Sequence, residues 1–343
     1  MRDAYQALTA YRTEWPPVEH NLADNTNAFG SAPSAIAALA ELATPGGLAG
    51  YPSVTVAGLR DALGEWLGVE PGSLLPGCGS NDLLDSAMRA LADPGATVAY
   101  AAPTFVMASY FAQSNSLRPL AVPLRSDHQV DAGALLATRA PVIYLASPNN
   151  PSGTATSREL VRTVLDEAPG IVIIDEAYAE FADHSWAVEA TRRPNVMVTR
   201  TFSKAWGLAG LRLGYAVGSP GLIGEVEKAR GPFKVNAVAE RVATRAVRND
   251  RAWLAEVVAR TRAGRERFAG RLREIGLAPL ASAANFVGLP VEDAPRVAAH
   301  AMQSGIAIRG FKGLPGIGDL VRVTIGPDEI MDRLVDALEA LPS

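Results

Sequence analysis

The sequence predicts an α/β protein with a large domain, built on a mainly parallel central sheet flanked by helices, and a smaller α+β domain. Two patterns in the 343 residues support this prediction. Short apolar runs alternate with amphipathic segments up to about residue 230, and the chain then changes to long, Arg- and Ala-rich helical sequence. We expect an N-terminal arm at 1–29, the large domain at 30–232 and the small domain at 233–343.

Five short runs are the candidate strands of the large domain. Most are apolar at successive positions, as expected of strands buried on both faces of a parallel sheet. Ligands bind at the carboxyl ends of the strands in such sheets, so residues at those ends become candidates for function. The runs are Thr97–Ala101, Val142–Ala146, Ile171–Asp175, Val196–Arg200 and Leu213–Gly218.

Helical periodicity accounts for much of the remaining sequence. In the large domain the predicted helical segments are Thr55–Val69, Leu83–Leu91 and Arg158–Ala168. The predicted small domain has helical sequence as far as Gly276, strands near Asn285–Leu289 and Leu320–Ile325, and a last helix at Asp328–Leu341.

The composition excludes several classes of protein. Hydrophobic residues make up 48% of the chain and charged residues 20%, which is typical of a folded globular protein. The net charge is -4 and the charges are scattered, so we expect small-molecule partners rather than nucleic acid or a membrane. Cys78 is the only cysteine, which excludes an internal disulfide and, with no recognisable signal peptide or spanning helix, predicts a cytoplasmic location. The four scattered histidines predict no metal site.

Four segments carry polar residues that a buried sheet edge does not require. They are Gly77–Asp82, Ser147–Thr154, Asp175–Tyr178 and Thr199–Gly214. The first favours a phosphate, because glycine lets the backbone approach a ligand and a helix start presents free N–H groups. Each also has an ordinary structural interpretation, as a helix cap or a turn.

Lys204 is the most informative residue of the fourth segment. It lies among Ser203, Ala205 and Trp206, and Arg212 follows eight positions later. An apolar setting near a second cation lowers the pKa of a lysine, and imine formation requires the free amine. A surface lysine whose stem covers apolar neighbours is the ordinary alternative.

Taken together, these motifs resemble the fold-type-I pyridoxal 5′-phosphate (PLP) aminotransferases. The residues that carry the resemblance are Asn150-Pro151, Asp175, Tyr178, Thr201, Ser203, Lys204 and Arg212, in that order and spacing. Within the superfamily, the chain is most similar to the histidinol-phosphate aminotransferase family, including relatives that act on aromatic amino acids. The resemblance implies transfer of an amino group from histidinol phosphate to 2-oxoglutarate, which yields imidazole acetol phosphate and glutamate.

The resemblance also implies roles for the catalytic residues Lys204, Asp175 and Tyr178. Lys204 would hold PLP as a Schiff base and move the proton at the substrate Cα. Asp175 would pair with the protonated pyridine nitrogen. Asn150 and Tyr178 would hydrogen-bond the 3′-oxygen of the ring, and Phe105 would stack on its face.

The other implied roles concern the cofactor phosphate and the substrate. Gly79, Ser80, Asn81, Thr201, Ser203 and Arg212 would hold the phosphate. Tyr51 would reach the same phosphate from the neighbouring subunit, which implies a homodimer with shared active sites. Arg322, with Asn27 and Tyr51, would bind the substrate, although a strand arginine facing water is the ordinary alternative for Arg322.

The sequence departs from the family pattern at four positions, of which Thr26 and Ala28 lie in a segment that lines the substrate pocket in the family. Thr26 replaces an acidic residue of the family pattern, and Ala28 replaces a proline. Ser53 replaces the usual aspartate, and Thr201 replaces a frequent serine. These changes leave PLP chemistry secure and the substrate open. Lys234 or Arg309 could add positive charge to the pocket, but the sequence does not place them.

Four other functions remain open. The first is an aromatic amino acid aminotransferase, in which Arg322 would grip a carboxylate. The others are a decarboxylase of a phosphorylated amino acid, a non-catalytic binding module with this fold, and a dinucleotide-binding protein. The last is weakly supported, because the glycines after Gly77 do not complete the G-x-G-x-x-G spacing.

Overall fold

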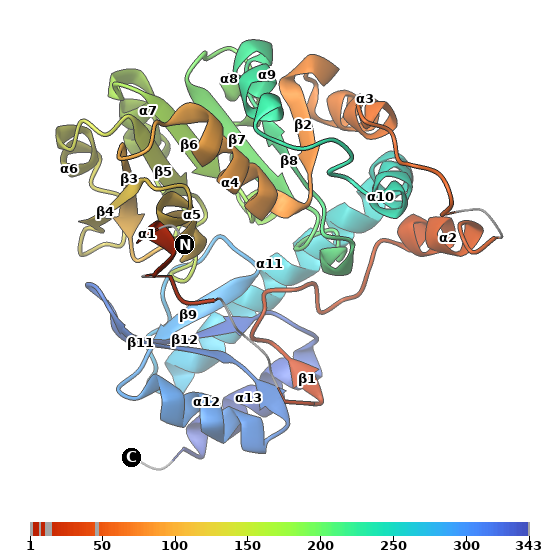
Figure 1. Ribbon diagram of the computed structural model, residues 1–343. Coiled ribbons are helices and arrows are strands. Elements are labelled where there is room, and N and C mark those ends of the chain that lie inside the picture. The colour runs from red at the N-terminus through yellow and green to blue at the C-terminus, as the bar shows by residue number, and fades with distance from the viewer. Residues whose placement is uncertain (1–2, 7, 11–15, 45–47, 342–343) are drawn as a thin grey trace.

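A seven-stranded sheet forms the centre of the larger part of the molecule (Figure 1). The computed structural model describes residues 3–6, 8–10, 16–44 and 48–341. The strand order in the sheet is β2-β8-β7-β6-β5-β3-β4, and all neighbouring strands are parallel except that β8 is antiparallel to both β2 and β7. The strands are β2 (Leu74–Gly77), β3 (Thr97–Ala102), β4 (Arg118–Pro123), β5 (Val142–Ala146), β6 (Ile171–Asp175), β7 (Val196–Thr201) and β8 (Gly214–Val217).

The predicted α/β class and mainly parallel sheet are confirmed, and all five predicted strands are present. Two further strands of this sheet, β2 and β4, were not predicted. β2 has only four residues and includes Pro76 and Gly77, which disfavour strands. β4 lies at the sheet edge and carries Arg118, Pro119 and Pro123, so it lacks the continuous apolar run of the central strands.

Helices cover both faces of this sheet. Successive residues of a strand point to opposite faces, and in β5 Ile143 and Leu145 belong to one buried apolar cluster while Val142, Tyr144 and Ala146 belong to the other. The first cluster includes residues of α2 (Pro33–Glu41), α3 (Ala57–Leu67), α6 (Ala132–Ala137), α7 (Arg158–Glu167), α8 (Ala187–Ala190) and α10 (Ala237–Asn249). The second includes residues of α4 (Gly79–Leu91), α5 (Met107–Ser114) and α9 (Pro220–Lys228).

A smaller, antiparallel sheet with the order β11-β12-β9 lies below the large one in Figure 1. A third apolar cluster lies between this sheet and the helices that pack on it. The strands are β9 (Phe286–Pro290), β11 (Arg309–Leu314) and β12 (Gly318–Thr324), and the helices α12 (Ala294–Gln303) and α13 (Asp328–Glu339). The strand β1 (His20–Asn21) pairs with β10 (Ile306–Ala307), so residues 20 and 21 join this part of the molecule. The short helix α1 (Asp3–Gln6) lies near α5.

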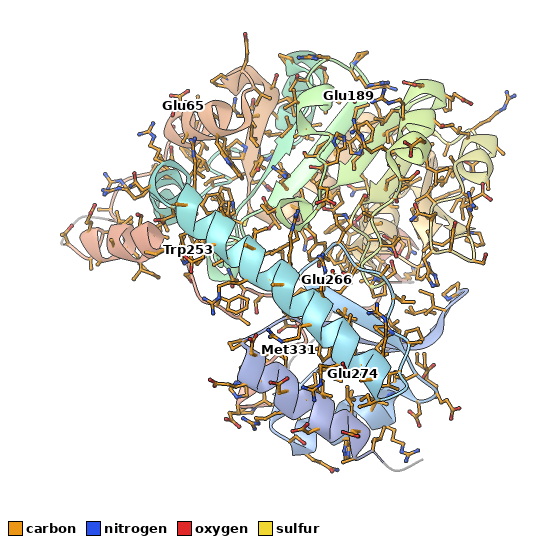
Figure 2. The ribbon with its side chains drawn as sticks, turned by 180° about the vertical axis from the view of Figure 1, so that it is seen from behind. Glu65, Glu189, Trp253, Glu266, Glu274 and Met331 are labelled. Carbon is orange, nitrogen blue, oxygen red and sulfur yellow. The ribbon has the colours of Figure 1, made fainter. Side chains whose placement is uncertain are left out.

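The helix α11 (Arg251–Glu274) links the two sheets. Figure 2 shows it crossing the back of the molecule from Trp253 to Glu274, where α13 lies beside it. Its early residue Leu254 belongs to a cluster of the large sheet, whereas Phe268 belongs to that of the small sheet. Because α10 packs against α2 and α3, the apolar core of the large sheet continues beyond residue 233. The division into 1–29, 30–232 and 233–343 stays a prediction.

In the described ranges, every helix is either too short or too polar to cross a membrane.

Candidate active site

A cavity of about 650 Å³ opens at the carboxyl ends of β5, β6 and β7 and extends to β11 and β12 of the small sheet. This is the position at which ligands bind in sheets of this kind. Most of the predicted site residues line it, although their motifs lie far apart in the sequence. They are Ser80, Asn81, Phe105, Asn150, Asp175, Tyr178, Thr201, Ser203, Lys204, Arg212 and Arg322.

Lys204 lies in the loop that follows β7, and its Nζ donates a hydrogen bond of 2.8 Å to the backbone oxygen of Asp24. Burial lowers the pKa of Lys204 to about 7, and the positive charges of Arg322 and Arg212 act in the same direction. The carboxylates of Asp24 and Asp175 oppose this shift. A large fraction of the amine is therefore unprotonated near neutral pH, as a nucleophilic lysine requires.

Asp175 ends β6 and is only 4% exposed. Its Oδ2 accepts a hydrogen bond of 2.9 Å from the Tyr144 hydroxyl. Its Oδ1 accepts from the Ala177 N–H at 3.2 Å and from the Thr199 hydroxyl at 3.3 Å. Burial raises the pKa of Asp175 to about 6, although these donors favour the ionised form. A carboxylate in this state is suited to a cationic partner in the cavity.

The small sheet and the N-terminal segment complete the cavity. Arg322 of β12 is 8% exposed, so its side chain does not face water. It donates to Asn150 Oδ1 at 2.6 Å and to the backbone oxygen of Ala23. The Tyr178 hydroxyl accepts a hydrogen bond of 2.9 Å from the Asn25 side chain. Asn150, Tyr178 and Arg322 are thus held in place by groups from distant parts of the chain.

Hydrogen-bond donors gather at one end of the cavity. Ser80 and Asn81 lie in the first turn of α4, whose N–H groups and dipole favour an anion. Thr201, Ser203 and Arg212 line the same cavity. Gly79 has a φ of +80°, and a Cβ there would lie 3.0 Å from the Arg212 guanidinium, so a larger residue would crowd this end. The arrangement fits a phosphate group.

Three predicted residues, Gly79, Asn27 and Tyr51, are not among those that line this cavity. The side chain of Asn27 donates to the Ala205 backbone oxygen at 2.8 Å and accepts from the Phe29 N–H, so it fastens the N-terminal segment beside Lys204. Tyr51 is 85% exposed and stacks on Phe233, with ring centroids 4.7 Å apart. In this position Tyr51 cannot serve the site of its own chain.

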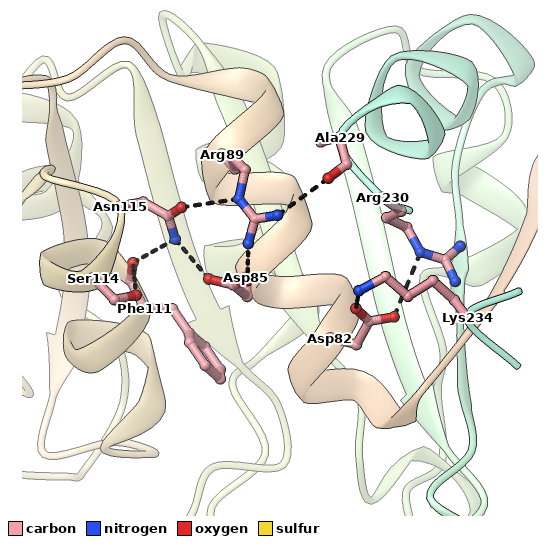
Figure 3. A network of polar contacts seen from close by, with 9 residues as sticks. All are labelled: Asp82, Asp85, Arg89, Phe111, Ser114, Asn115, Ala229, Arg230 and Lys234. Atoms are coloured by element: carbon pink, nitrogen blue, oxygen red, sulfur yellow. Dashed lines mark hydrogen bonds and ion pairs between the residues drawn. The ribbon is translucent and has the colours of Figure 1, made fainter. Parts of the chain in front are cut away.

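Of the two candidate cations, Lys234 and Arg309, only Arg309 lines the cavity. Figure 3 shows Lys234 and Arg230 both directed at Asp82 of α4, and the Lys234 Nζ lies 3.2 Å from Asp82 Oδ1. Lys234 therefore fixes the start of α4 and is not a lining residue. Arg309 of β11 lines the cavity instead.

Several residues of the site were not found from the sequence. Tyr144 interrupts an otherwise aliphatic strand, which is the one local signal that could have identified it. Thr199 begins the selected segment Thr199–Gly214, but its contact with Asp175, like that of Asn25 with Tyr178, joins residues distant in the sequence and was not predicted. Within the described residues no cluster of His, Cys, Asp and Glu could hold a metal ion.

Comparison with known proteins agrees with this geometry. The family described as "Aminotransferase class I and II" matches residues 18–338. The chain belongs to this family.

Individual relatives cover nearly the whole chain. A histidinol-phosphate aminotransferase of Roseiflexus castenholzii is 40% identical over 336 residues, which are 94% of this chain and 90% of the relative. The crystal structure of a histidinol-phosphate aminotransferase from Sinorhizobium meliloti, in complex with pyridoxal-5′-phosphate, is 30% identical with a TM-score of 0.90, over 99% of this chain and 96% of that one. Aspartate aminotransferase from Thermus thermophilus, at 19% identity and a TM-score of 0.79 over 93% of this chain and 90% of that one, shares the fold.

The protein is thus a PLP-dependent aminotransferase of fold type I. The cavity fits PLP, because a partly deprotonated amine, a buried carboxylate and a group of anion-binding donors all line it. When bound, PLP supplies a ring that stabilises negative charge at the substrate Cα. Lys204 would hold its carbonyl carbon, Asp175 its pyridine nitrogen, and the donors around Ser80 and Arg212 its phosphate.

Close packing behind the phosphate end predicts the effect of Gly214→Ala. The new Cβ would lie 2.6 Å from the Ser80 nitrogen and 2.7 Å from the Arg200 backbone oxygen, so the backbone of the phosphate end must shift. We expect the dissociation constant for PLP to rise at least tenfold, or by about 1.4 kcal/mol, in a titration of the apoprotein. The control Gly224→Ala, where no atom lies within 4 Å, should bind PLP normally. Equal affinities in folded protein would contradict this account.

The buried carboxyl of Asp175 predicts a pH dependence of the apoprotein. Its pKa is about 6 in the folded chain, against an ordinary value of 3.8, so folding favours its protonated form. The resulting stability is complete below about pH 4 and is lost as the pH rises through about 6. Asp175→Asn cannot ionise, so above pH 7 it should gain up to about 3 kcal/mol in the free energy of unfolding relative to wild type, a gain absent at pH 4.

Urea denaturation of the two apoproteins across this pH range measures the effect. Asp319→Asn is the matched control, because the Asp319 carboxylate accepts hydrogen bonds from the Ala294 and Gly313 N–H groups and its pKa is lowered. Its change in stability should have the opposite sign. A constant difference between Asp175→Asn and wild type at all pH values would disprove the prediction.

Proposed function

We propose that this aminotransferase transfers the amino group of histidinol phosphate to 2-oxoglutarate, which yields imidazole acetol phosphate and glutamate. The relative from Roseiflexus castenholzii and the solved enzyme from Sinorhizobium meliloti carry the name histidinol-phosphate aminotransferase, which supports the proposal. The observation that carries it is a second cationic position in the cavity, apart from the phosphate end at α4.

Arg309 and Arg322 form this second position. They are direct partners in the antiparallel pairing of β11 and β12, and both line the cavity. Like charges directly opposite each other are destabilising, so an anion between or beside them would relieve the repulsion. Their guanidinium groups lie 5.7 and 5.4 Å from the ring centre of Phe311. An arginine pair next to an aromatic ring suits a substrate that carries both a phosphate and an imidazole.

An aromatic amino acid is the alternative amino donor. Its single carboxylate would need one arginine, whereas the phosphate of histidinol phosphate carries about two negative charges near neutral pH and suits two. The ring of either substrate would contact the aromatic lining residues, among them Tyr100, Phe105 and Phe311. Arg309 is therefore the residue that should distinguish the two.

The test is an assay of purified holoenzyme with 2-oxoglutarate and either histidinol phosphate or phenylalanine. We expect turnover of histidinol phosphate and its loss in Lys204→Ala. Arg309→Gln should raise KM for histidinol phosphate about tenfold or more and leave kcat/KM for any phenylalanine turnover within about threefold. Lys312→Gln, on the same strand but outside the cavity lining, is the control. Faster turnover of phenylalanine, or release of carbon dioxide without use of 2-oxoglutarate, would replace the proposed reaction.

We also propose a homodimer in which Tyr51 of each subunit completes the site of the other. Large apolar side chains are exposed on α2 and in the segment between α2 and α3 that contains Tyr51, namely Ile36, Leu39, Leu48 and Val54. Such a group of exposed apolar residues is typical of a protein–protein interface. The cytoplasmic location inferred from the sequence stays a prediction.

Subunit mixing tests the shared site. Lys204→Ala and Tyr51→Ala should each be strongly impaired alone. In a mixed dimer, one site combines the native Lys204 of one subunit with the native Tyr51 of the other. Refolding the two variants together should therefore restore about a quarter of the wild-type activity if subunits pair at random. Activity that stays at the sum of the two separate variants would rule out a shared site.

A further inference from the structure

Tyr144 lies behind the cavity, in the middle of β5, and its side chain is completely buried. In the parallel pairing of β5 with β6, Ala146 is the partner of Asp175 and Tyr144 is the partner of Ile173. Residues two apart on a strand share a face, so Tyr144 and Asp175 project on the same side of the sheet. The Tyr144 hydroxyl reaches Asp175 Oδ2 at 2.9 Å and does not line the cavity.

This contact is the shortest of the three hydrogen bonds that Asp175 accepts in the described structure. Thr199 and Ala177 both donate to Oδ1, so Tyr144 is the donor to the other oxygen. Burial of Asp175 is the main effect that disfavours its ionised form, and the negative charge of Glu176 acts in the same direction. Asp175 also interacts electrostatically with Lys204 and with Tyr178.

We propose that Tyr144 is a positioning residue that keeps Asp175 ionised. The proposal rests on the assignment of Asp175 to the pyridine nitrogen of PLP. With Asp175 ionised, the proton shared by its carboxylate and that nitrogen stays on the nitrogen. A donor to a carboxylate stabilises its charged form and makes it a weaker competitor for that proton. The hydroxyl acts through Asp175 and never touches the substrate.

Tyr144→Phe removes the donor and keeps the ring in its packed position. Asp175 then becomes more basic, and the ring nitrogen loses part of its positive charge. A less positive ring withdraws fewer electrons from the Lys204 nitrogen, so the midpoint of the pH-dependent change in the visible absorption of the holoenzyme should rise by about 0.5 to 1 pH unit. We expect kcat to fall about tenfold, with a smaller change in PLP affinity.

Tyr215→Phe is the matched control. Tyr215 is equally buried in the same sheet, on β8, but its hydroxyl accepts a hydrogen bond from Arg200 at 3.3 Å instead of donating to Asp175. Its spectral midpoint should equal that of wild type. Thr199→Val, which removes a longer hydrogen bond to Oδ1, should shift the midpoint in the same direction by less.

If Tyr144→Phe binds PLP poorly, the pH dependence of the stability of the apoprotein tests the proposal instead. In the Tyr144→Phe apoprotein, the pH at which stability is lost through ionisation of Asp175 should move upward from about 6. Unchanged spectral and stability midpoints in Tyr144→Phe would overturn the proposal, and so would an equal shift in Tyr215→Phe. Because neither midpoint involves an amino donor, this result is independent of whether histidinol phosphate is the substrate.

Discussion

The burial of the Asp175 carboxyl group at the end of β6 is the constraint on which the site depends. Burial alone favours the neutral acid, and hydrogen-bond donors from β5 and β7 oppose this tendency. The result is a group that, when ionised, is suited to a cationic partner inside the cavity. Lys204, one strand further along, is held partly deprotonated by the same environment and by two arginines. Burial in the same region thus raises the pKa of Asp175 and lowers the pKa of Lys204.

The N-terminal segment at residues 23–25 joins the two sheets at this point. The backbone oxygen of Asp24 accepts from Lys204 of the large sheet, and that of Ala23 accepts from Arg322 of the small sheet. The Asn25 side chain donates to Tyr178, while its backbone oxygen accepts from Asn285. Three consecutive residues therefore link the large sheet to the small sheet beside the cavity, and the backbone oxygen of each accepts a hydrogen bond.

The charges of the cavity are divided between its two sides. Arg212 lies with the start of α4 on the large sheet, and Arg309 and Arg322 lie on the small sheet. The proposed function assigns the first group to the phosphate of the cofactor and the second to the phosphate of the substrate, at separate places in one cavity. Because α11 connects the two sheets, any change in their relative position would alter the distance between these anion sites.

The sequence by itself determined the fold class, the central strands and the motifs at their carboxyl ends, because these depend on local apolar runs and on residue spacing. Asp175, Lys204 and Arg212 could be selected in this way. It did not reveal β2 and β4, whose prolines, glycine and short length hide the apolar pattern.

Only the tertiary structure decided which groups surround the selected residues. Three contacts show this: the Tyr144 hydroxyl with Asp175, Lys204 with the backbone oxygen of Asp24, and Lys234 with Asp82, which leaves Arg309 but not Lys234 in the cavity lining. Each joins elements that are distant in the sequence and are brought together by packing. Hydrogen bonds of this kind depend on the distances between helices, strands and loops. The local sequence around a residue does not predict these distances. Local pattern predicts the chemistry a residue can perform, and packing sets its protonation state and its partners.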